Sequence, residues 1–380
     1  MYDCIVIGAG VAGASVARRF ADAKKSVLVI DKRDHVGGNV YECYSNNGIR
    51  IHKYGPHIFH TNFKEVLDFL TRFCEFYDYR HKVQGLIDGY LVPIPFNFTS
   101  LETLYSPQKA EEIKKKLKEN FSTPKVSILD LLSHSDKTIK EFGEFVYEKV
   151  FVHYTAKQWG IPIEQVDKSV INRVPVVLSY EDGYFHDEYQ CMPKYGFTDM
   201  IDKMLDDENI TVKLNKNAQD SFSFKEDGIY YEGEKVDCPI VYTGAIDELL
   251  DYRFGVLPYR SLNLVFEDMD IPAFQPASVV NFPNSEDFTR ITEFKHLTLQ
   301  ESPVTTILKE YPAKYDVNGK IGNIPYYSIE NAENRAIHDK YREYLTKYPN
   351  FYLLGRLAEY KYYNIDVSVK RALELSDELL

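Results

Sequence analysis

The chain has 380 residues, of which 44% are hydrophobic and 27% charged, and its formal net charge is −12. This length predicts two or three structural units, and the acidic balance argues against nucleic acid as a partner, because phosphate backbones repel a negative surface. No apolar run reaches the roughly 18 residues that a membrane span needs, and no signal peptide is recognisable. The five cysteines form no CxxC pair, so we expect free thiols in a reducing cytoplasm.

A glycine-rich turn near the N-terminus is the first motif with a chemical meaning. Residues 2–7 are predicted to form a buried parallel strand, and a helix follows directly after Gly8, Gly10 and Gly13. This GxGxxG spacing permits a tight turn, close approach of a pyrophosphate and close packing of helix on strand. Asp31 ends the second predicted strand, where a carboxylate would accept hydrogen bonds from an adenosine ribose. The pattern predicts a Rossmann-type dinucleotide site.

The residues after Asp31 bear on whether the dinucleotide is NAD or FAD. A Gly-Gly pair that ends at Gly38 follows the acidic residue, as in the FAD motif of the glutathione-reductase and amine-oxidase flavoproteins, which this segment resembles. Those proteins often carry Arg after the glycines, where Asn39 stands here. Segments 241–244 and 351–355 also resemble that class, and Arg356 is placed to contact a cofactor phosphate. The resemblance favours FAD, with NAD as the alternative.

The remaining chain alternates between helical and strand patterns without repeats or low-complexity linkers. Helical spacing predicts one helix over about 62–79 and an inserted bundle over about 100–160, whereas residues 262–311 have strand character. We therefore expect an α/β fold in which a discontinuous Rossmann-type FAD-binding domain carries an inserted helical bundle and a mixed or antiparallel β-sheet domain. The expected division is residues 1–80, 194–248 and 338–380 for the FAD-binding domain, 81–165 for the helical insertion, and 166–193 with 249–337 for the substrate-binding sheet.

Several long motifs resemble signatures of bacterial UDP-galactopyranose mutases, and the likeness runs from Met1 to the last helix. That family interconverts UDP-galactopyranose and UDP-galactofuranose by ring contraction without net redox change, with N5 of reduced FAD as the nucleophile at the anomeric carbon. The resemblance implies the same reaction, FAD that is active when reduced, and an external reductant such as NAD(P)H. Family members are often dimers, so it leaves a homodimer open. The motifs are residues 52–61, 154–160, 251–255, 289–290, 325–327 and 357–363.

The resemblance also assigns roles to individual residues. Two arginines, Arg173 and Arg290, are expected to hold the diphosphate, because a planar guanidinium grips phosphate oxygens bidentately. His60 is expected near the sugar, where it favours plain galactose over the N-acetylated sugar. Substrate contacts are assigned to Phe151, Tyr154, Trp159, Tyr184, Asn281, Tyr327 and Tyr362. Cofactor contacts are assigned to Gly8, Gly10, Gly13, Asp31, Lys32, Gly38, Asn39, His57, Ile58, Arg356, Asn364 and Ile365.

Two features limit this reading. His52, His57 and His60 could suggest a metal site, but their spacing fits no zinc pattern and no Cys or acid completes it, so we expect no metal. Asn364 stands where the family often has Asp, so the charge near the cofactor differs; Asp366 lies two residues further on.

Three other functions remain open beside this one. A mutase for another nucleotide sugar, such as dTDP-fucose or UDP-N-acetylgalactosamine, would share the fold. A flavin oxidoreductase acting on an amine or a polyene is disfavoured, because such a substrate needs no diphosphate-binding arginines. A nucleotide-sugar-binding regulator without catalysis is disfavoured by the intact flavin motif and by both arginines.

Overall fold

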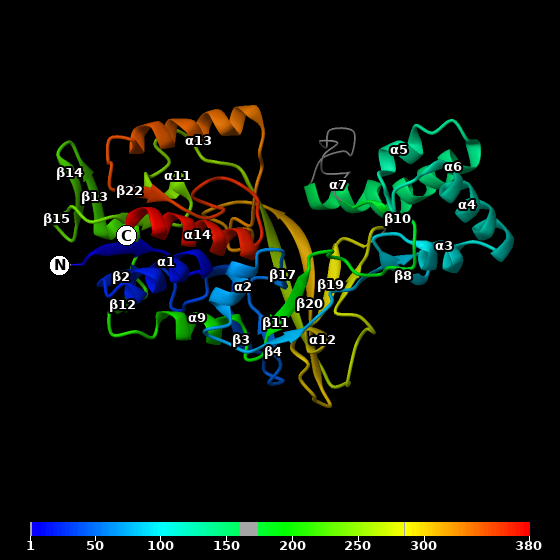
Figure 1. Ribbon diagram of the computed structural model, residues 1–380, viewed down its shortest axis with the longest axis horizontal. Coiled ribbons are helices and arrows are strands. Elements are labelled where there is room, and N and C mark those ends of the chain that lie inside the picture. Colours follow the sequence, from blue (N-terminus) through cyan, green and yellow to red (C-terminus); the bar gives the residue numbers. More distant parts are fainter. Residues whose placement is uncertain (1, 160–173, 285) are drawn as a thin grey trace.

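The computed structural model describes residues 2–159, 174–284 and 286–380, except the side chains of Thr155, Gln158 and Trp159. Figure 1 shows a three-part arrangement, with an α/β unit that holds both termini at one end, a helical unit at the other, and long antiparallel strands between them. Within the described ranges, no helix is both long enough and apolar enough to span a bilayer.

The α/β unit is built on a five-stranded parallel sheet. Its central strand β1 (Cys4–Ile7) is buried along its whole length, as expected for a strand covered by helices on both faces. Cys4 and Val6 point into one core, and Ile5 and Ile7 into another, because side chains alternate along a strand. The strand order is β12 (Ile210–Lys213), β2 (Val27–Ile30), β1, β16 (Ile240–Tyr242) and β22 (Phe351–Leu353).

Helices cover both faces of this sheet. The first core packs under α1 (Val11–Asp22), α9 (Phe197–Leu205) and α14 (Ile365–Leu379). The second packs under α11 (Ile246–Leu249) and α13 (Ala332–Leu345). The sheet thus takes its strands from three distant stretches of the chain, and the predicted discontinuous Rossmann-type fold is confirmed. In such open sheets, ligands bind beyond the carboxyl ends of the strands.

A seven-stranded mixed sheet occupies the middle of the molecule (Figure 1). All neighbouring strands run antiparallel except the pair β18 and β7. The hairpin of β7 and β8 extends this sheet, although the sequence division placed these residues with the helices. The order is β21 (Tyr327–Ser328), β17 (Tyr259–Met269), β20 (Thr305–Lys314), β19 (Arg290–Glu293), β18 (Val279–Asn281), β7 (Val83–Ile87) and β8 (Tyr90–Ile94).

The single helix predicted over 62–79 is wrong. Helix α2 (Lys64–Leu70) is short, and the chain then turns into β6 (Phe76–Asp78). Strand β6 pairs with β11 (Tyr189–Pro193), which also pairs with β5 (Phe59–Thr61). Backbone pairing with a distant strand outweighs the local helical spacing, because tertiary context overrides weak propensity.

The helical unit forms the far end of the molecule, and its helices begin at capping residues. The side chains of Ser106, Ser127 and Asp136 each accept a hydrogen bond from a first-turn N–H group. A six-residue π-helical stretch, η2 (Tyr147–Val152), leads directly into α7. The helices are α3 (Phe98–Leu104), α4 (Pro107–Asn120), α5 (Ile128–Leu132), α6 (Lys137–Val146) and α7 (His153–Trp159).

Candidate functional site

The glycine-rich turn brings β1 and α1 as close together as their backbones allow. A Cβ atom on Gly13 would lie 1.9 Å from the Gly8 carbonyl oxygen, so only glycine fits there. A Cβ atom on Gly10 would instead lie 3.6 Å from the Cα atom of Gly38, so these two backbones pack in contact with no side chain between them. Gly10 caps α1 without any side-chain hydrogen bond, which leaves the first N–H groups of the helix available to an anion. This turn fits a dinucleotide pyrophosphate.

Asp31 holds the glycine-rich turn in place at the end of β2. One carboxylate oxygen accepts a 2.7 Å hydrogen bond from the Ala9 N–H group, and the other accepts a 2.9 Å bond from the Arg33 N–H group. The carboxylate therefore lies beside the turn, where a ribose of the dinucleotide would pass. Of the neighbouring predicted residues, Lys32 pairs with Glu248, and the Asn39 amide oxygen accepts a 2.9 Å bond from Arg33.

The loop after β22 brings Arg356 to the same edge of the sheet. Its guanidinium donates a 2.8 Å hydrogen bond to the Tyr326 carbonyl oxygen and lies over two aromatic rings, 5.5 Å from the Tyr327 centroid and 4.6 Å from that of Tyr362. The two rings are 5.7 Å apart. A cation and two phenols thus share one surface beside the dinucleotide fold, which suits a phosphate group.

Helix α14 begins at the same edge. Asn364 caps it without a side-chain hydrogen bond to the helix, while its carbonyl oxygen accepts bonds from the N–H and Oγ groups of Ser368. Ile58 and Ile365 both pack against the core beneath this edge. The amide of Asn364 is therefore a neutral donor where an Asp would place a negative charge. Asp366, in the first turn of α14, accepts a 2.8 Å bond from the Val367 N–H group.

His57 is held in one neutral form. Its Nδ1 donates a 2.8 Å bond to the Gly55 carbonyl oxygen, and its backbone N–H donates a 3.0 Å bond to Nδ1 of His52. Burial lowers the pKa of His57 to about 3, with further lowering from His52, Arg356 and Arg290, and the hydrogen bond to Gly55 opposes this only in part. Its Nε2 therefore remains a hydrogen-bond acceptor at neutral pH.

His60 forms a dyad with Asp187. Its Nδ1 lies 2.7 Å from a carboxylate oxygen of Asp187, and its ring stacks on Phe185 with 3.7 Å between centroids and 16° between planes. The other carboxylate oxygen of Asp187 accepts a 2.8 Å bond from Asn62. A carboxylate on Nδ1 fixes the ring orientation and leaves Nε2 as the nitrogen that can exchange a proton with a ligand.

The three motif histidines do not converge. His52 lies 3.2 Å from the buried carboxylate of Glu42, and His57 and His60 have the separate partners given above. Among the residues that the structure describes, no group of three or more His, Cys, Asp or Glu side chains could hold a metal ion.

Arg290 lies on the face of the seven-stranded sheet that turns toward this region. It is directly opposite Glu310 on β20 and Asn281 on β18. Its Nε donates a 2.6 Å bond to Glu310, whose side chain is 2% exposed. Burial alone would lower the pKa of Arg290, but Glu310 holds it well above the usual range. The guanidinium is thus permanently charged, with its orientation set through Nε.

Phenol groups surround Arg290. Burial raises the pKa of the Tyr154 hydroxyl, and Arg290 opposes this while Tyr184 and Tyr327 add to it, so these three residues all lie within electrostatic reach of Tyr154. The four residues come from α7, β19, β21 and the segment before β11. The structure therefore assembles a cationic, phenol-lined cluster from segments up to 173 residues apart in the chain.

One predicted substrate residue, Phe151, lies away from this cluster. Phe151 is 6% exposed and packs in the core of the helical unit with Phe142 and Val146. The Trp159 side chain and the whole of Arg173 lie outside the described residues.

Sequence reasoning missed the residues that hold the predicted ones. Glu310, Asp187 and Phe185 stand in no motif that carries meaning alone, and they became visible only as neighbours of Arg290 and His60. Lys157 was not singled out either, although it lies inside the motif at 154–160.

Comparison with known proteins identifies the family. The model of the UDP-galactopyranose mutase family matches residues 149–362, and a model of an NAD(P)-binding Rossmann-like domain matches residues 6–73. The UDP-galactopyranose mutase of Mycoplasma genitalium is 35% identical, with 100% of this chain and 95% of that protein covered. The chain belongs to the UDP-galactopyranose mutase family.

It is therefore a nucleotide-sugar mutase, an isomerase of pyranose and furanose forms, with a Rossmann-like domain of the FAD-binding kind. The dTDP-fucopyranose mutase of Escherichia coli is 32% identical, with 98% of this chain and 97% of that protein covered. The two identities are too similar to separate one sugar from the other. A crystal structure of reduced UDP-galactopyranose mutase superposes with a TM-score of 0.70 at 16% identity, over 100% of this chain and 93% of that one, which confirms the fold.

Proposed function

We propose that this mutase interconverts UDP-galactopyranose and UDP-galactofuranose, and that it does so with FAD in the reduced state. The observation that carries the proposal is Arg290, a permanently charged guanidinium fixed by buried Glu310 and surrounded by tyrosines. A second cation, Arg356, lies beside Tyr327 and Tyr362 at the carboxyl edge of the parallel sheet. This arrangement suits a diphosphate that must be held while its bond to the sugar breaks and re-forms.

The residues at the sheet edge fit FAD. The uncapped N-terminus of α1 at Gly10 suits a pyrophosphate, Asp31 lies where a ribose would pass, and α14 begins at the same edge. Reduced FAD would supply the nucleophile for the anomeric carbon, with no net change in its oxidation state. An external reductant such as NAD(P)H would bring FAD to that state.

The protein side chains would divide the remaining work. Arg290 and Arg356 would neutralise the departing UDP, and Tyr327 and Tyr362 would donate hydrogen bonds to its phosphate oxygens. His60, oriented by Asp187, would lie near the sugar. Its Nε2 would exchange a proton with a sugar hydroxyl as the ring opens and closes. We assign Arg173 and Trp159 to the same nucleotide site, as the motif resemblance implies.

The test is turnover with defined nucleotide sugars. The FAD-loaded protein is reduced anaerobically with dithionite, given UDP-galactofuranose or dTDP-fucofuranose, and the products are separated by chromatography. We expect conversion of UDP-galactofuranose to the pyranose form only after reduction. Arg290→Ala should lower kcat/KM by about 10²-fold or more, as for loss of one transition-state donor.

Arg342→Ala is the matched control, because Arg342 lies exposed on α13 and pairs only weakly, at 3.7 Å, with Asp339. It should leave turnover unchanged. Selective conversion of the dTDP sugar would replace the proposed substrate by the one that the Escherichia coli relative is named for. Turnover by the oxidised protein would refute the role of reduced FAD.

A further inference from the structure

Three backbone carbonyl groups converge on the ammonium group of Lys157. Its Nζ lies 2.6 Å from the oxygen of Phe282, 2.8 Å from that of Glu286 and 3.2 Å from that of Phe288. An ammonium group has three N–H donors and no acceptor, so these contacts use its full donor capacity. All three carbonyls belong to the connection between β18 and β19, whereas Lys157 belongs to α7.

This connection joins two residues of the proposed nucleotide site. It leaves β18 after Asn281 and enters β19 at Arg290. Its described residues hold together through a 2.9 Å bond from the Phe282 N–H group to the Thr289 carbonyl and through the rings of Phe282 and Phe288, 4.9 Å apart. These contacts shape the loop but do not attach it to α7.

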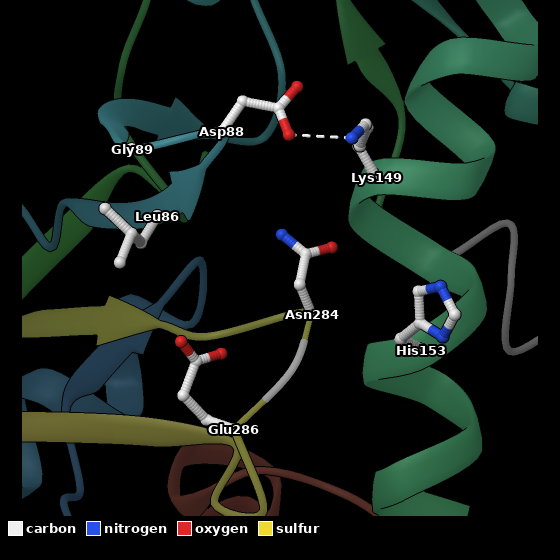
Figure 2. Close-up of a pocket in the computed structure, with 7 residues that line it drawn as sticks. All are labelled: Leu86, Asp88, Gly89, Lys149, His153, Asn284 and Glu286. Atoms are coloured by element: carbon white, nitrogen blue, oxygen red, sulfur yellow. Dashed lines mark hydrogen bonds and ion pairs between the residues drawn. The ribbon is translucent and has the colours of Figure 1, made fainter.

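A cavity of about 580 Å³ lies between the β7–β8 hairpin, the η2–α7 segment and the same loop. Figure 2 shows the residues that line it. An unfilled space of this size cannot press the loop against the helix, because dispersion contacts need atoms on both sides. Its lining residues are Leu86, Asp88, Gly89, Lys149, His153, Asn284 and Glu286.

The positive charge of Lys157 suits it to hold these three carbonyl groups. The side chain is partly buried, and burial lowers its pKa, while the nearby carboxylates of Glu286 and Asp287 oppose that shift. Removing the ammonium would leave three inward-facing carbonyl groups without their donor, which costs free energy wherever water cannot replace it.

We propose that Lys157 is a positioning residue, which ties α7 to the β18–β19 connection so that Tyr154 and Arg290 line one nucleotide cleft. Tyr154 and Lys157 are three residues apart and share one side of the helix. The tie therefore sets how far Tyr154 lies from Arg290. The choice of UDP as the ligand rests on the proposed function. Lys157 itself is not proposed to contact the substrate.

The experiment compares Lys157→Met, Lys157→Arg and Lys149→Met in the FAD-loaded protein. Lys149 is the matched control, because it lies two helical turns earlier and its ammonium makes a 2.7 Å ion pair with Asp88 on the hairpin (Figure 2). UDP is titrated while the fluorescence of the chain's one tryptophan, Trp159, is recorded. Hydrogen exchange is followed in peptides that cover residues 282–289.

Lys157→Met should raise the Kd for UDP about tenfold or more and should speed exchange across residues 282–289, while FAD uptake stays unchanged. Lys157→Arg should recover much of the affinity, because a guanidinium also donates to carbonyl groups. Lys149→Met should stay within twofold of the wild type in both readouts.

An unchanged Kd together with unchanged exchange in Lys157→Met would overturn the proposal, and so would loss of FAD uptake, because that would indicate a general structural role. If Lys157→Met fails to fold, the test becomes the rate of hydrogen exchange across residues 282–289 in Lys157→Arg, compared with the wild type. A wild-type protein that does not bind UDP would refute the proposed function, yet the exchange comparison would still test the tie.

Discussion

Alanine at Gly10 and alanine at Gly13 should separate two roles of the glycine-rich turn. At Gly13 the new Cβ atom would lie 1.9 Å from the Gly8 carbonyl oxygen, whereas real Cβ contacts stay beyond 3.0 Å. Helix α1 would have to move by about 1.1 Å, and overpacking of this kind costs roughly 1–3 kcal/mol. At Gly10 the Cβ atom would lie 3.6 Å from Gly38, which is an ordinary contact, and the backbone there is extended.

Thermal unfolding of both variants, without and with added FAD, is the assay. In a chain of this size, 1 kcal/mol shifts Tm by about 1.3 °C, so Gly13→Ala should lower the Tm of the cofactor-free protein by about 1–4 °C. Gly10→Ala should leave that Tm within about 1 °C of the wild type.

Added FAD should then distinguish the variants a second time. At 100 times its Kd, a ligand stabilises the folded state by about 2.7 kcal/mol, or about 3 °C here. The wild type should show this rise and Gly10→Ala should not, because its methyl group would stand on the turn where the pyrophosphate has to approach the backbone. Uptake of FAD by Gly10→Ala at wild-type affinity would refute the placement of the pyrophosphate over this turn.

Two further predictions concern the carboxyl groups of Asp187 and Asp247. Asp187→Asn should lower kcat about tenfold or more with little change in KM, because His60 loses the charge that fixes its Nδ1 proton; equal turnover by Asp187→Asn and the wild type would exclude the dyad from the reaction. Burial raises the pKa of Asp247 to about 6 from 3.8, although a 2.8 Å bond from the Leu257 N–H group opposes this. A raised folded-state pKa gives stability that is complete below pH 3.8 and is lost as pH rises through 6, by at most about 3 kcal/mol. The Tm difference between Asp247→Asn and the wild type should therefore shift in favour of Asp247→Asn from pH 4 to pH 7, and a difference that does not change with pH would contradict this.

Local pattern was enough for the dinucleotide-binding end of the molecule. The run of buried residues in β1, the spacing of Gly8, Gly10 and Gly13, and the position of Asp31 all act within one β–α–β stretch. Neighbours in sequence are neighbours in space there, so spacing alone predicts which groups meet. The failed helix over 62–79 marks the limit, because β6 exists only through its pairing with β11.

The partners of the catalytic candidates depend on strand register across long separations. Glu310 lies under Arg290 because β19 and β20 pair with these two residues opposite each other, and a slip of one residue would turn Glu310 to the other face. Asp187 reaches His60 across 127 residues, and Lys157 reaches its loop across 125 to 131. No spacing rule spans such distances. The residue types that bind a nucleotide sugar can be recognised from the sequence alone. Which groups set their charge and orientation depends on how the strands and helices pack.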